Sequence, residues 1–143
     1  MVNKKIRGAT SLVSDGISFK SQLEVVIYKE LLRAGFNPKY EERKFVIWEG
    51  IKPTKPFYNR DIQTKMLKLD MGKMRDITYT PDFTFEYNDY FIIIEAKGYE
   101  NDTFPIKKKM FRKILESYNK ALYFEIFTKK QLVDAIKIIK EYE

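Results

Sequence analysis

Two acidic residues and a lysine follow one another at short spacing near the middle of the chain. Asp82 comes directly after a proline, and Glu95 and Lys97 stand two residues apart at the end of an apolar run. Between them, the polar pair Asn88-Asp89 is flanked by aromatic and β-branched residues, which is typical of a β-hairpin loop. With that pair as the loop, Asp82 lies directly opposite Glu95 on the neighbouring strand.

The predicted pairing brings two like charges together on one face of the hairpin. Directly opposed residues of antiparallel strands have Cβ atoms about 4.5–5.5 Å apart, and two carboxylates placed in this way repel each other. A bound cation would offset the repulsion. Because side chains alternate along a strand, Lys97 shares the face of Glu95, whereas Ala96 has only its backbone carbonyl to offer on that side.

The composition narrows the chemistry that these residues can carry. The chain has no Cys and no His, which excludes Cys/His zinc sites, cysteine nucleophiles, disulfides and an imidazole general base. Two carboxylates form a hard oxygen site that suits Mg²⁺, with Mn²⁺ as a substitute. Magnesium commonly binds one or two carboxylates together with a substrate phosphate, so the pattern favours phosphodiester hydrolysis.

Lys97 and Glu24 are the further candidates for catalysis. Lys97 can orient or deprotonate an attacking water and offset the charge that grows on a phosphate. Glu24 follows the core-facing Leu23 in a predicted helix and could complete a second metal site. The segment Ser21-Gln22-Leu23-Glu24 also has the spacing of a capping box, in which Glu24 would bind a backbone N–H. Both roles of Glu24 stay open at this point.

The chain is basic, and a group of cations lies in one predicted helix. Its 143 residues include 27 Lys and Arg against 20 Asp and Glu, a formal charge of +7, which favours DNA or another polyanion as partner. The helix, expected from Thr103 to about Tyr118, has Ile106, Met110 and Ile114 on its apolar side. Its cations are predicted to bind DNA phosphates: Lys107, Lys108, Lys109, Arg112 and Lys113.

The hydrophobic periodicities predict a mixed α/β domain. The expected elements are, in chain order, a helix at 18–34, a strand at 40–48, a hairpin at 78–97, the helix from 103, a strand at 121–127 and a last helix capped by Thr128. The strand–helix–strand unit requires a crossover, which sets the last strand parallel to the strand of Glu95. The expected fold is therefore an αβββαβ core with a four-stranded mixed sheet flanked by helices.

One domain is expected over residues 18–143, preceded by a flexible basic arm at 1–17 that either touches phosphates or is a solvated terminus. Residues 49–76 are either a short helix or a long mobile loop inserted into the domain. No apolar run approaches the ~18 residues of a membrane span, and no signal-peptide core is found. A cytoplasmic protein without membrane contact is therefore expected.

The motifs together resemble the PD-(D/E)XK nuclease superfamily, through Pro81-Asp82 and Glu95-Ala96-Lys97 and through the order of elements over about residues 18–127. The resemblance implies a Mg²⁺-dependent endodeoxyribonuclease with the restriction-endonuclease-like fold. It implies that Asp82, Glu95 and the carbonyl of Ala96 bind metal, that Lys97 serves the water, and that Glu24 is the carboxylate contributed by the first helix.

Within that superfamily, the segments 19–24, 79–83 and 95–98 resemble the motifs of phage T-seven-type endonuclease I, a family of Holliday junction resolvases. This implies branched DNA as substrate, a homodimer, and a phage or mobile-element protein that acts in the host cytoplasm. The segment between the first strand and the Pro-Asp strand is longer here and differently composed than in that family. Exchange of elements between two subunits, with Glu24 acting in trans, therefore stays open.

The function expected from the sequence is thus a metal-dependent DNA endonuclease. Two alternatives stay open: a non-catalytic nucleic-acid-binding module on the same fold, and an RNA nuclease, since no feature of the sequence separates the two nucleic acids. The intact set of two acids and one lysine argues against the binding module. An ordinary surface hairpin in which Lys97 neutralises Glu95 explains the Glu-x-Lys spacing alone, but not its combination with Pro-Asp and Glu24.

Overall fold

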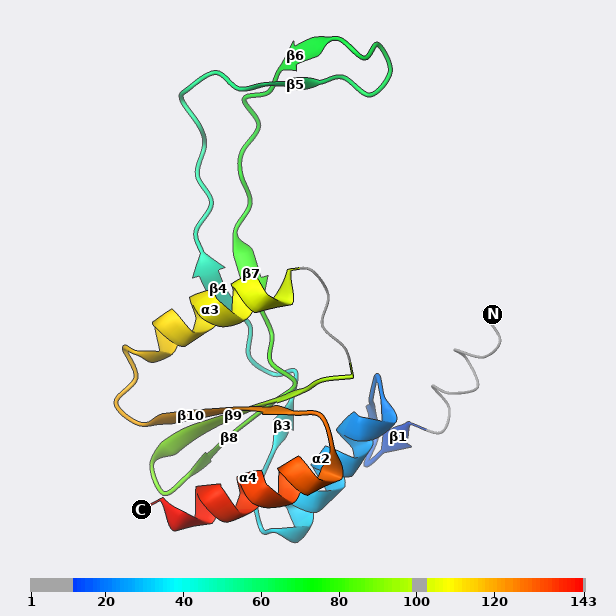
Figure 1. The fold of residues 1–143 in the computed structure, drawn as a ribbon, viewed down its shortest axis with the longest axis vertical. Helices are drawn as coiled ribbons and strands as arrows, with labels where there is room; N and C mark the ends of the chain where they lie inside the picture. Colours follow the sequence, from blue (N-terminus) through cyan, green and yellow to red (C-terminus); the bar gives the residue numbers. More distant parts are fainter. Residues whose placement is uncertain (1–11, 99–102, 143) are drawn as a thin grey trace.

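The computed structural model describes residues 12–98 and 103–142, which form a four-stranded sheet with helices on both faces (Figure 1). The strand order is β10-β9-β8-β3, with the bounds Ala121–Ile126 for β10, Tyr90–Ala96 for β9, Phe83–Tyr87 for β8 and Lys39–Tyr40 for β3. β10 runs parallel to β9, and the other pairs are antiparallel. The predicted mixed α/β fold with a four-stranded mixed sheet is confirmed.

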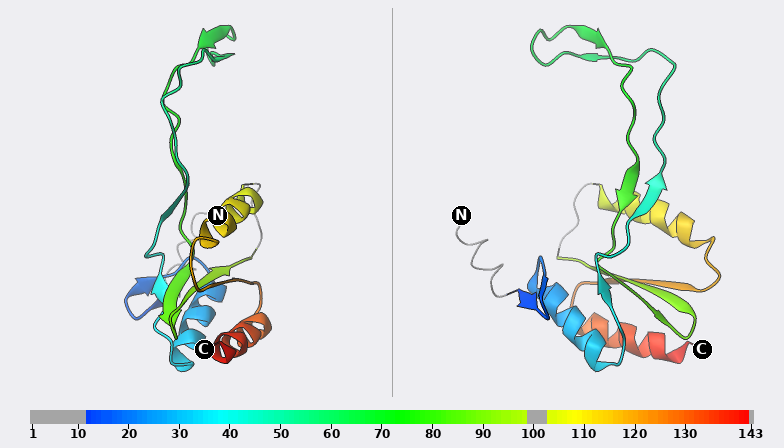
Figure 2. Two further views of the ribbon diagram at one scale, coloured as in Figure 1. Left: turned by 90° about the vertical axis from the view of Figure 1, so that its left-hand side faces the viewer. Right: turned by 180° about the vertical axis from the view of Figure 1, so that it is seen from behind.

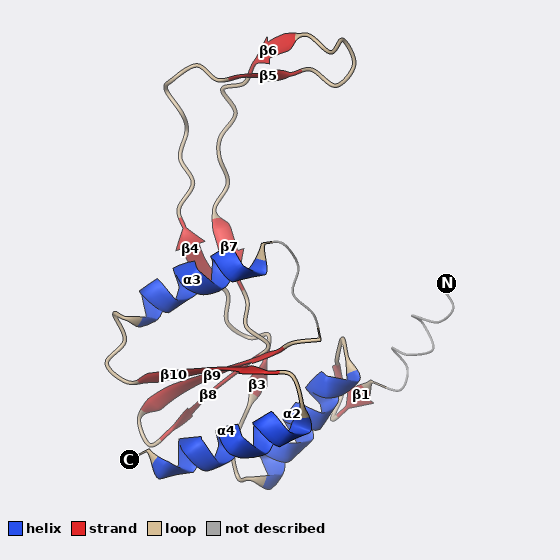
Figure 3. Ribbon diagram, in the orientation of Figure 1, coloured by secondary structure: helices blue, strands red, loops and turns tan. Residues whose placement is uncertain are grey.

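Within the described residues three helices cover the sheet, with α2 (Gln22–Arg33) and α4 (Lys129–Glu141) on one face and α3 (Phe104–Leu115) on the other (Figures 1 and 3). α2 begins later than predicted because Ser21 is its N-cap, with Ser21 Oγ accepting from the Glu24 N–H at 3.1 Å. The predicted capping box of Thr128 and Gln131 opens α4. No helix among residues 12–98 and 103–142 is long and apolar enough to cross a membrane.

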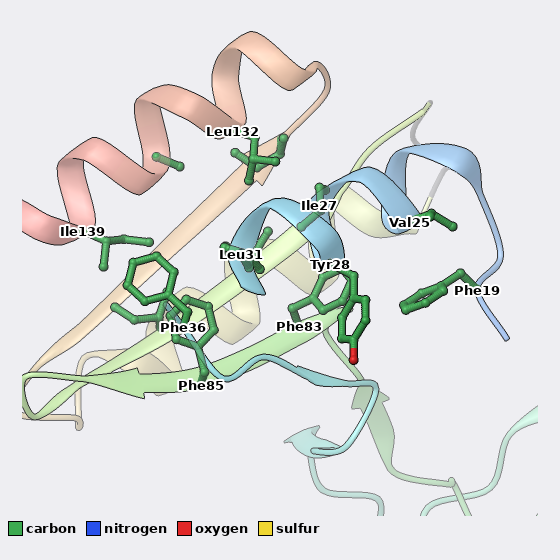
Figure 4. Packing of buried hydrophobic residues seen from close by; sticks show 14 of the residues in the cluster. Phe19, Val25, Ile27, Tyr28, Leu31, Phe36, Phe83, Phe85, Leu132 and Ile139 are labelled. Atoms are coloured by element: carbon green, nitrogen blue, oxygen red, sulfur yellow. The ribbon is translucent and has the colours of Figure 1, made fainter. Parts of the chain in front are cut away.

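The helices bury two separate cores, one on each face of the sheet. Figure 4 shows the first, in which Ile27 and Leu31 of α2 and Leu132 of α4 pack toward Phe83 of β8. In the second, Phe111 of α3 packs near Ile93. Because β9 lies between both cores, its side chains are apolar on both faces, as its unbroken apolar sequence requires.

Helix α3 contacts the sheet through part of the predicted stripe, since Met110 and Ile114 pack against the second core. Phe104 and Phe111, two turns apart, are the buried residues of the helix. The prediction that Ile106 lies inside is wrong, because its side chain is 63% exposed. The two phenylalanines direct the helix because they bury the largest apolar areas available on it.

The β8–β9 hairpin has the predicted register. Tyr87 pairs with Tyr90 next to the loop, and Phe83 pairs with Ile94 at the far end. Asn88 and Asp89 have φ angles of +50° and +67°, which is the conformation of a type I′ turn and matches the twist of the two strands. The pairing ends at Phe83, so Asp82, which this register sets opposite Glu95, lies one residue beyond the paired part of β8.

The single strand predicted at 40–48 is broken in two. β3 pairs with β8 in the main sheet, whereas β4 (Phe45–Trp48) pairs with β7 (Ile77–Tyr79) outside it. At the break Glu41 has a φ of +48°, and its N–H donates to the Asp82 carbonyl oxygen at 2.8 Å. A residue in this left-handed conformation cannot continue a strand, so the chain turns away from the sheet here.

Residues 45–79, which we call the ribbon, form one long hairpin. Its base, β4 and β7, packs on the second core beside α3, and the rest extends away from the body of the molecule (Figures 1 and 2). β5 (Tyr58–Arg60) and β6 (Leu67–Leu69) pair near its end. The helix interpretation of 49–76 is wrong, because the segment is an extended insertion, mostly without regular secondary structure, in which β5 and β6 form the paired part. The helical spacing of Ile62, Met66 and Leu69 has no surface to pack against, and a helix of this length is marginal without one.

The structure of residues 12–19 also differs from the expectation. β1 (Val13–Ser14) and β2 (Ile17–Ser18) form a small hairpin, flanked by the buried residues Leu12 and Phe19. The predicted flexible arm is therefore wrong for residues 12–17. The rest of that prediction, residues 1–11, lies outside the described residues.

Candidate active site

The four residues predicted to be catalytic come together within one chain. Asp82 precedes β8, Glu95 and Lys97 lie at the end of β9, and Glu24 lies in the first turn of α2. All four are buried, with 6% to 8% of each residue exposed. Three carboxyl groups and one amine thus lie close together at the ends of the two central strands, β8 and β9.

Asp82 is positioned by the break in the strand pairing. Because it lies outside the ladder, its carboxylate turns toward β9, where Oδ2 accepts from the Ala96 N–H at 2.7 Å. Burial, followed by the negative charges of Glu95 and Glu24, raises the pKa of Asp82 to about 8, although the Ala96 N–H opposes the rise. In the absence of a cation the group therefore holds a proton near neutral pH.

Glu95 is held by one tyrosine and one lysine. Its Oε1 accepts from the Tyr79 hydroxyl at 2.6 Å, and its Oε2 lies 3.6 Å from Lys97 Nζ. The Tyr79 hydroxyl is also 2.9 Å from that of Tyr123. Burial raises the pKa of Glu95, while the Tyr79 hydrogen bond and the charge of Lys97 oppose the rise.

Lys97 is fixed between an anion and an aromatic ring. Besides the contact with Glu95, its Nζ lies 3.2 Å from the centroid of the Phe104 ring at the start of α3. Both partners attract a cation. The two contacts leave the amine at the surface of the acid cluster, in a fixed position.

Glu24 faces the other side of Asp82 and has its own hydrogen bonds. Its Oε1 accepts from the Lys20 N–H at 2.7 Å and from the Tyr40 hydroxyl at 2.8 Å. The capping contact thus reaches Lys20 rather than the N-cap residue Ser21, so the sequence interpretation of a reciprocal box is only half right. The same carboxylate contributes to the raised pKa of Asp82, which places it in the acid cluster as well.

The residues fit a hard divalent cation that brings its own water. Among the described residues no group of three or more acidic side chains is arranged to hold a metal ion. Mg²⁺, however, often takes only one or two carboxylates and keeps several waters. Asp82 and Glu95 supply that pair, and a cation between them would relieve the repulsion that raises the pKa of Asp82. The Ala96 carbonyl as a further ligand stays a prediction.

An open pocket of about 460 Å³ lies over these groups. Asp82, Glu95 and Lys97 line it, and two more lysines, Lys20 before α2 and Lys107 on α3, line it as well. Lys20 forms an ion pair of 2.8 Å with Glu41. The pocket therefore brings together three cations and three acids, of which Glu41 is paired with Lys20.

The five cations predicted to bind DNA do not form one surface. Lys107 lines the pocket, whereas Lys108 Nζ forms a 2.9 Å ion pair with Glu125 of β10. The other three are exposed on α3: Lys109, Arg112 and Lys113. Consecutive helix positions are about 100° apart around the axis, so a run such as 107–109 necessarily points in different directions.

Several residues of the site were not found from the sequence. Tyr40 and Tyr123 lie outside the motifs, and Tyr79 lies in the segment 79–83 without a predicted role. Their hydroxyls come to the site only through the folding of three separate strands. Glu125 had a usable signal, because it is the one acid in its strand and parallel pairing aligns it with Glu95. Its Oε2 is buried and has no hydrogen-bond partner within the described part of the chain.

Comparison with known proteins gives a single family. The family model DUF1064, described as a protein of unknown function, matches residues 4–130. Neither the curated proteins nor the solved structures contain a match to the chain. The matched region spans the four candidate catalytic residues and the whole ribbon.

Proposed function

The chain belongs to the DUF1064 family, and we propose that it is a metal-dependent DNA endonuclease that hydrolyses phosphodiester bonds. The observation that carries the proposal is the buried pair of acids Asp82 and Glu95 beside Lys97, at the floor of a pocket lined by further lysines. Buried acids of this kind ionise readily only beside a cation, and the lysines attract a polyanion.

Mg²⁺ is the ion that the donor set suits best, with Mn²⁺ as a substitute. Asp82 and Glu95 would hold it, with Glu24 close by. When bound, the ion polarises a phosphoryl oxygen and lowers the pKa of a bound water. The Tyr79 hydroxyl keeps Glu95 in one orientation through its 2.6 Å hydrogen bond, so the carboxylate is ready for the ion without rearrangement.

The amines of the pocket position the substrate and the water. Lys97 Nζ, held by Glu95 and Phe104, orients a water for attack on phosphorus and offsets the charge that grows on the phosphate. As the new oxygen–phosphorus bond forms, the bond to the leaving sugar oxygen breaks. The proton lost by the water passes to solvent, and the leaving oxygen takes up a proton from solvent. Lys20 and Lys107 bind neighbouring phosphates.

Selectivity for branched DNA is the finer form of the proposal. Its support is the resemblance of the motifs to those of junction resolvases, together with a long basic ribbon that ends at Tyr79, three residues before Asp82. The predicted homodimer belongs to the same proposal.

The deciding experiment measures Mg²⁺-dependent nicking of four substrates: a four-way junction, a flap, a linear duplex and an RNA duplex. We expect the wild-type protein to cut DNA, with the junction or flap cut fastest. Asp82→Asn and Glu95→Gln should each lower the rate at least 1,000-fold, roughly 4 kcal/mol of transition-state stabilisation, and should retain DNA binding.

Two exposed acids give matched controls, because Asp134→Asn and Glu86→Gln make the same chemical changes outside the pocket. Both controls should cut at the wild-type rate. Cleavage of RNA but not DNA would replace the proposal with an RNA nuclease. Tight binding without cleavage of any substrate would replace it with a binding module.

A further inference from the structure

The ribbon is the largest feature that the proposed chemistry leaves unexplained. Its two sides are linked along the length, since the Met74 N–H donates to the Ile51 carbonyl at 2.9 Å and the Asp70 N–H to that of Phe57 at 2.7 Å. Figure 2 shows it edge-on as a narrow extension of the body. Its base is part of the site, because β7 ends at Tyr79, the residue that holds Glu95.

Three of the four acids of the ribbon accept hydrogen bonds within it, and the fourth, Glu49, is exposed. The Thr64 N–H donates to Asp61, the Gly72 N–H to Asp70 and the Gly50 N–H to Asp76, each at 2.8 or 2.9 Å. Five of its basic residues have no ion pair or hydrogen-bonded side chain within the described part of the chain: Lys55, Arg60, Lys65, Lys73 and Arg75. These cations lack an anion.

The far end of the ribbon is apolar. Ile62, Met66 and Leu67 lie around its turn and are 79%, 68% and 75% exposed. Arg60, Lys65 and Lys68 lie among them in the sequence. Three bulky apolar side chains surrounded by cations and held away from the body are unusual on a protein surface and mark an interaction site.

We infer that the ribbon binds a groove of duplex DNA, with its cations on the phosphates and Ile62, Met66 and Leu67 inserted as a wedge between base steps. The inference rests on the proposed function for its choice of DNA. Narrow β-ribbons fit DNA grooves, and minor-groove proteins insert apolar side chains that unstack a step and bend the duplex. The wedge gives a role to the exposed apolar residues that lie among these cations.

The charge distinguishes DNA from a second copy of the chain as the occupant. Two ribbons laid against each other would bring the same unpaired cations together, on a chain whose formal charge is already +7. A phosphate backbone supplies the missing anions instead. The ribbon meets the site at its base, where β7 ends at Tyr79.

The test uses the full chain with Asp82→Asn, so that DNA stays intact, and a 30-base-pair duplex. Fluorophores at the two ends report bending, and 2-aminopurine reports unstacking. The wedge variant Ile62→Ser/Met66→Ser/Leu67→Ser should abolish both signals while keeping the salt dependence of binding. The charge variant Lys55→Ala/Arg60→Ala/Lys65→Ala should lower the slope of log K against log salt by about 3.

All six positions are exposed, so the variants are expected to fold. Val133→Ser/Ile138→Ser, which removes two exposed apolar residues of α4, is the matched control and should change neither signal. Bending that survives in the wedge variant, or a salt slope unchanged in the charge variant, overturns the inference. Sedimentation adds a further check: a dimer lost in the wedge variant while bending persists would assign the ribbon to a second copy.

Cleavage is measured separately in the same variants carrying Asp82. Bending without cleavage by any version would refute the nuclease but keep the ribbon inference. Cleavage by the wild-type protein, together with DNA bending that is unchanged in the wedge variant, would refute the ribbon inference alone.

Discussion

At the scale of single residues, the hydroxyl of Tyr79 is the contact that fixes Glu95. Tyr79→Phe removes the 2.6 Å hydrogen bond to Glu95 and the 2.9 Å hydrogen bond to Tyr123, and keeps the ring in its core. Partners that orient a ligand typically contribute 10- to 100-fold to metal affinity or activity. We expect the Mg²⁺ concentration for half-maximal cleavage to rise by about that factor while the melting temperature falls only slightly.

The matched control for this change is Tyr118→Phe. Tyr118 stacks on Phe91 in the same core, away from the acids, and should leave the Mg²⁺ dependence unchanged. An equal effect of both substitutions would show that Tyr79 acts only through packing.

The raised pKa of Asp82 makes a prediction about stability against pH. The folded group has a pKa of about 8, against 3.8 for the ordinary value. Between these pH values the folded protein binds a proton that the unfolded chain has released, so the free energy of unfolding falls as the pH rises from about 4 to about 8. The fall is on the order of a few kcal/mol, and Asp82→Asn should remove most of it.

The measurement is urea unfolding of the metal-free protein at several pH values, for Asp82→Asn and for the exposed control Asp134→Asn. The difference between the two curves isolates Asp82 from the other titrating groups. A free energy of unfolding of Asp134→Asn that rises over this pH range, relative to that of Asp82→Asn, would contradict a raised pKa of Asp82.

At the scale of elements, the ribbon depends on a close approach at Gly50. A Cβ added there would lie 1.8 Å from the backbone oxygen of Met74, and no side-chain adjustment can relieve a clash with backbone. Gly50→Ala should therefore separate the two sides of the ribbon near its base. We expect hydrogen exchange of the Met74 amide, which is bonded to Ile51, to become at least tenfold faster.

Gly72→Ala is the comparison, because a Cβ there meets only the side chain of Asp70, at 3.1 Å. The sheet amides of β8 and β9 should exchange at the wild-type rate in both variants, since the ribbon lies outside that sheet. Unchanged protection of Met74 in Gly50→Ala would mean that the ribbon accommodates the change elsewhere.

At the scale of the whole molecule, the site is assembled from one chain. Glu24 and Lys97 both contribute to the cluster around Asp82 and Glu95 without a second copy. Mixing inactive Glu24→Ala and Lys97→Ala proteins should therefore restore no cleavage, because neither chain then has an intact set. Recovery of about a quarter of wild-type activity after confirmed subunit exchange would show instead that the two residues act across subunits.

The element order and the hairpin register were predictable because local patterns carry them. The run Phe91 to Ile94 is apolar on both faces, and Asn88-Asp89 suits a turn with two positive φ angles, so the pairing of β8 with β9 followed. The closeness of Asp82, Glu95 and Lys97 depends only on that pairing. The position of Glu24 depended also on Ser21, whose capping role marks the start of α2.

What only the tertiary structure decided are the features that depend on contacts between distant segments. The break at Glu41 frees Asp82 for Ala96, and no local pattern signals it, because its cause is the divergence of the ribbon from the sheet. The ribbon itself has a helical spacing of apolar residues, but it has no surface to pack on. The sequence by itself therefore determined which groups could do the chemistry, and the tertiary structure decided which tyrosines and lysines hold them, because those partners come from four different elements.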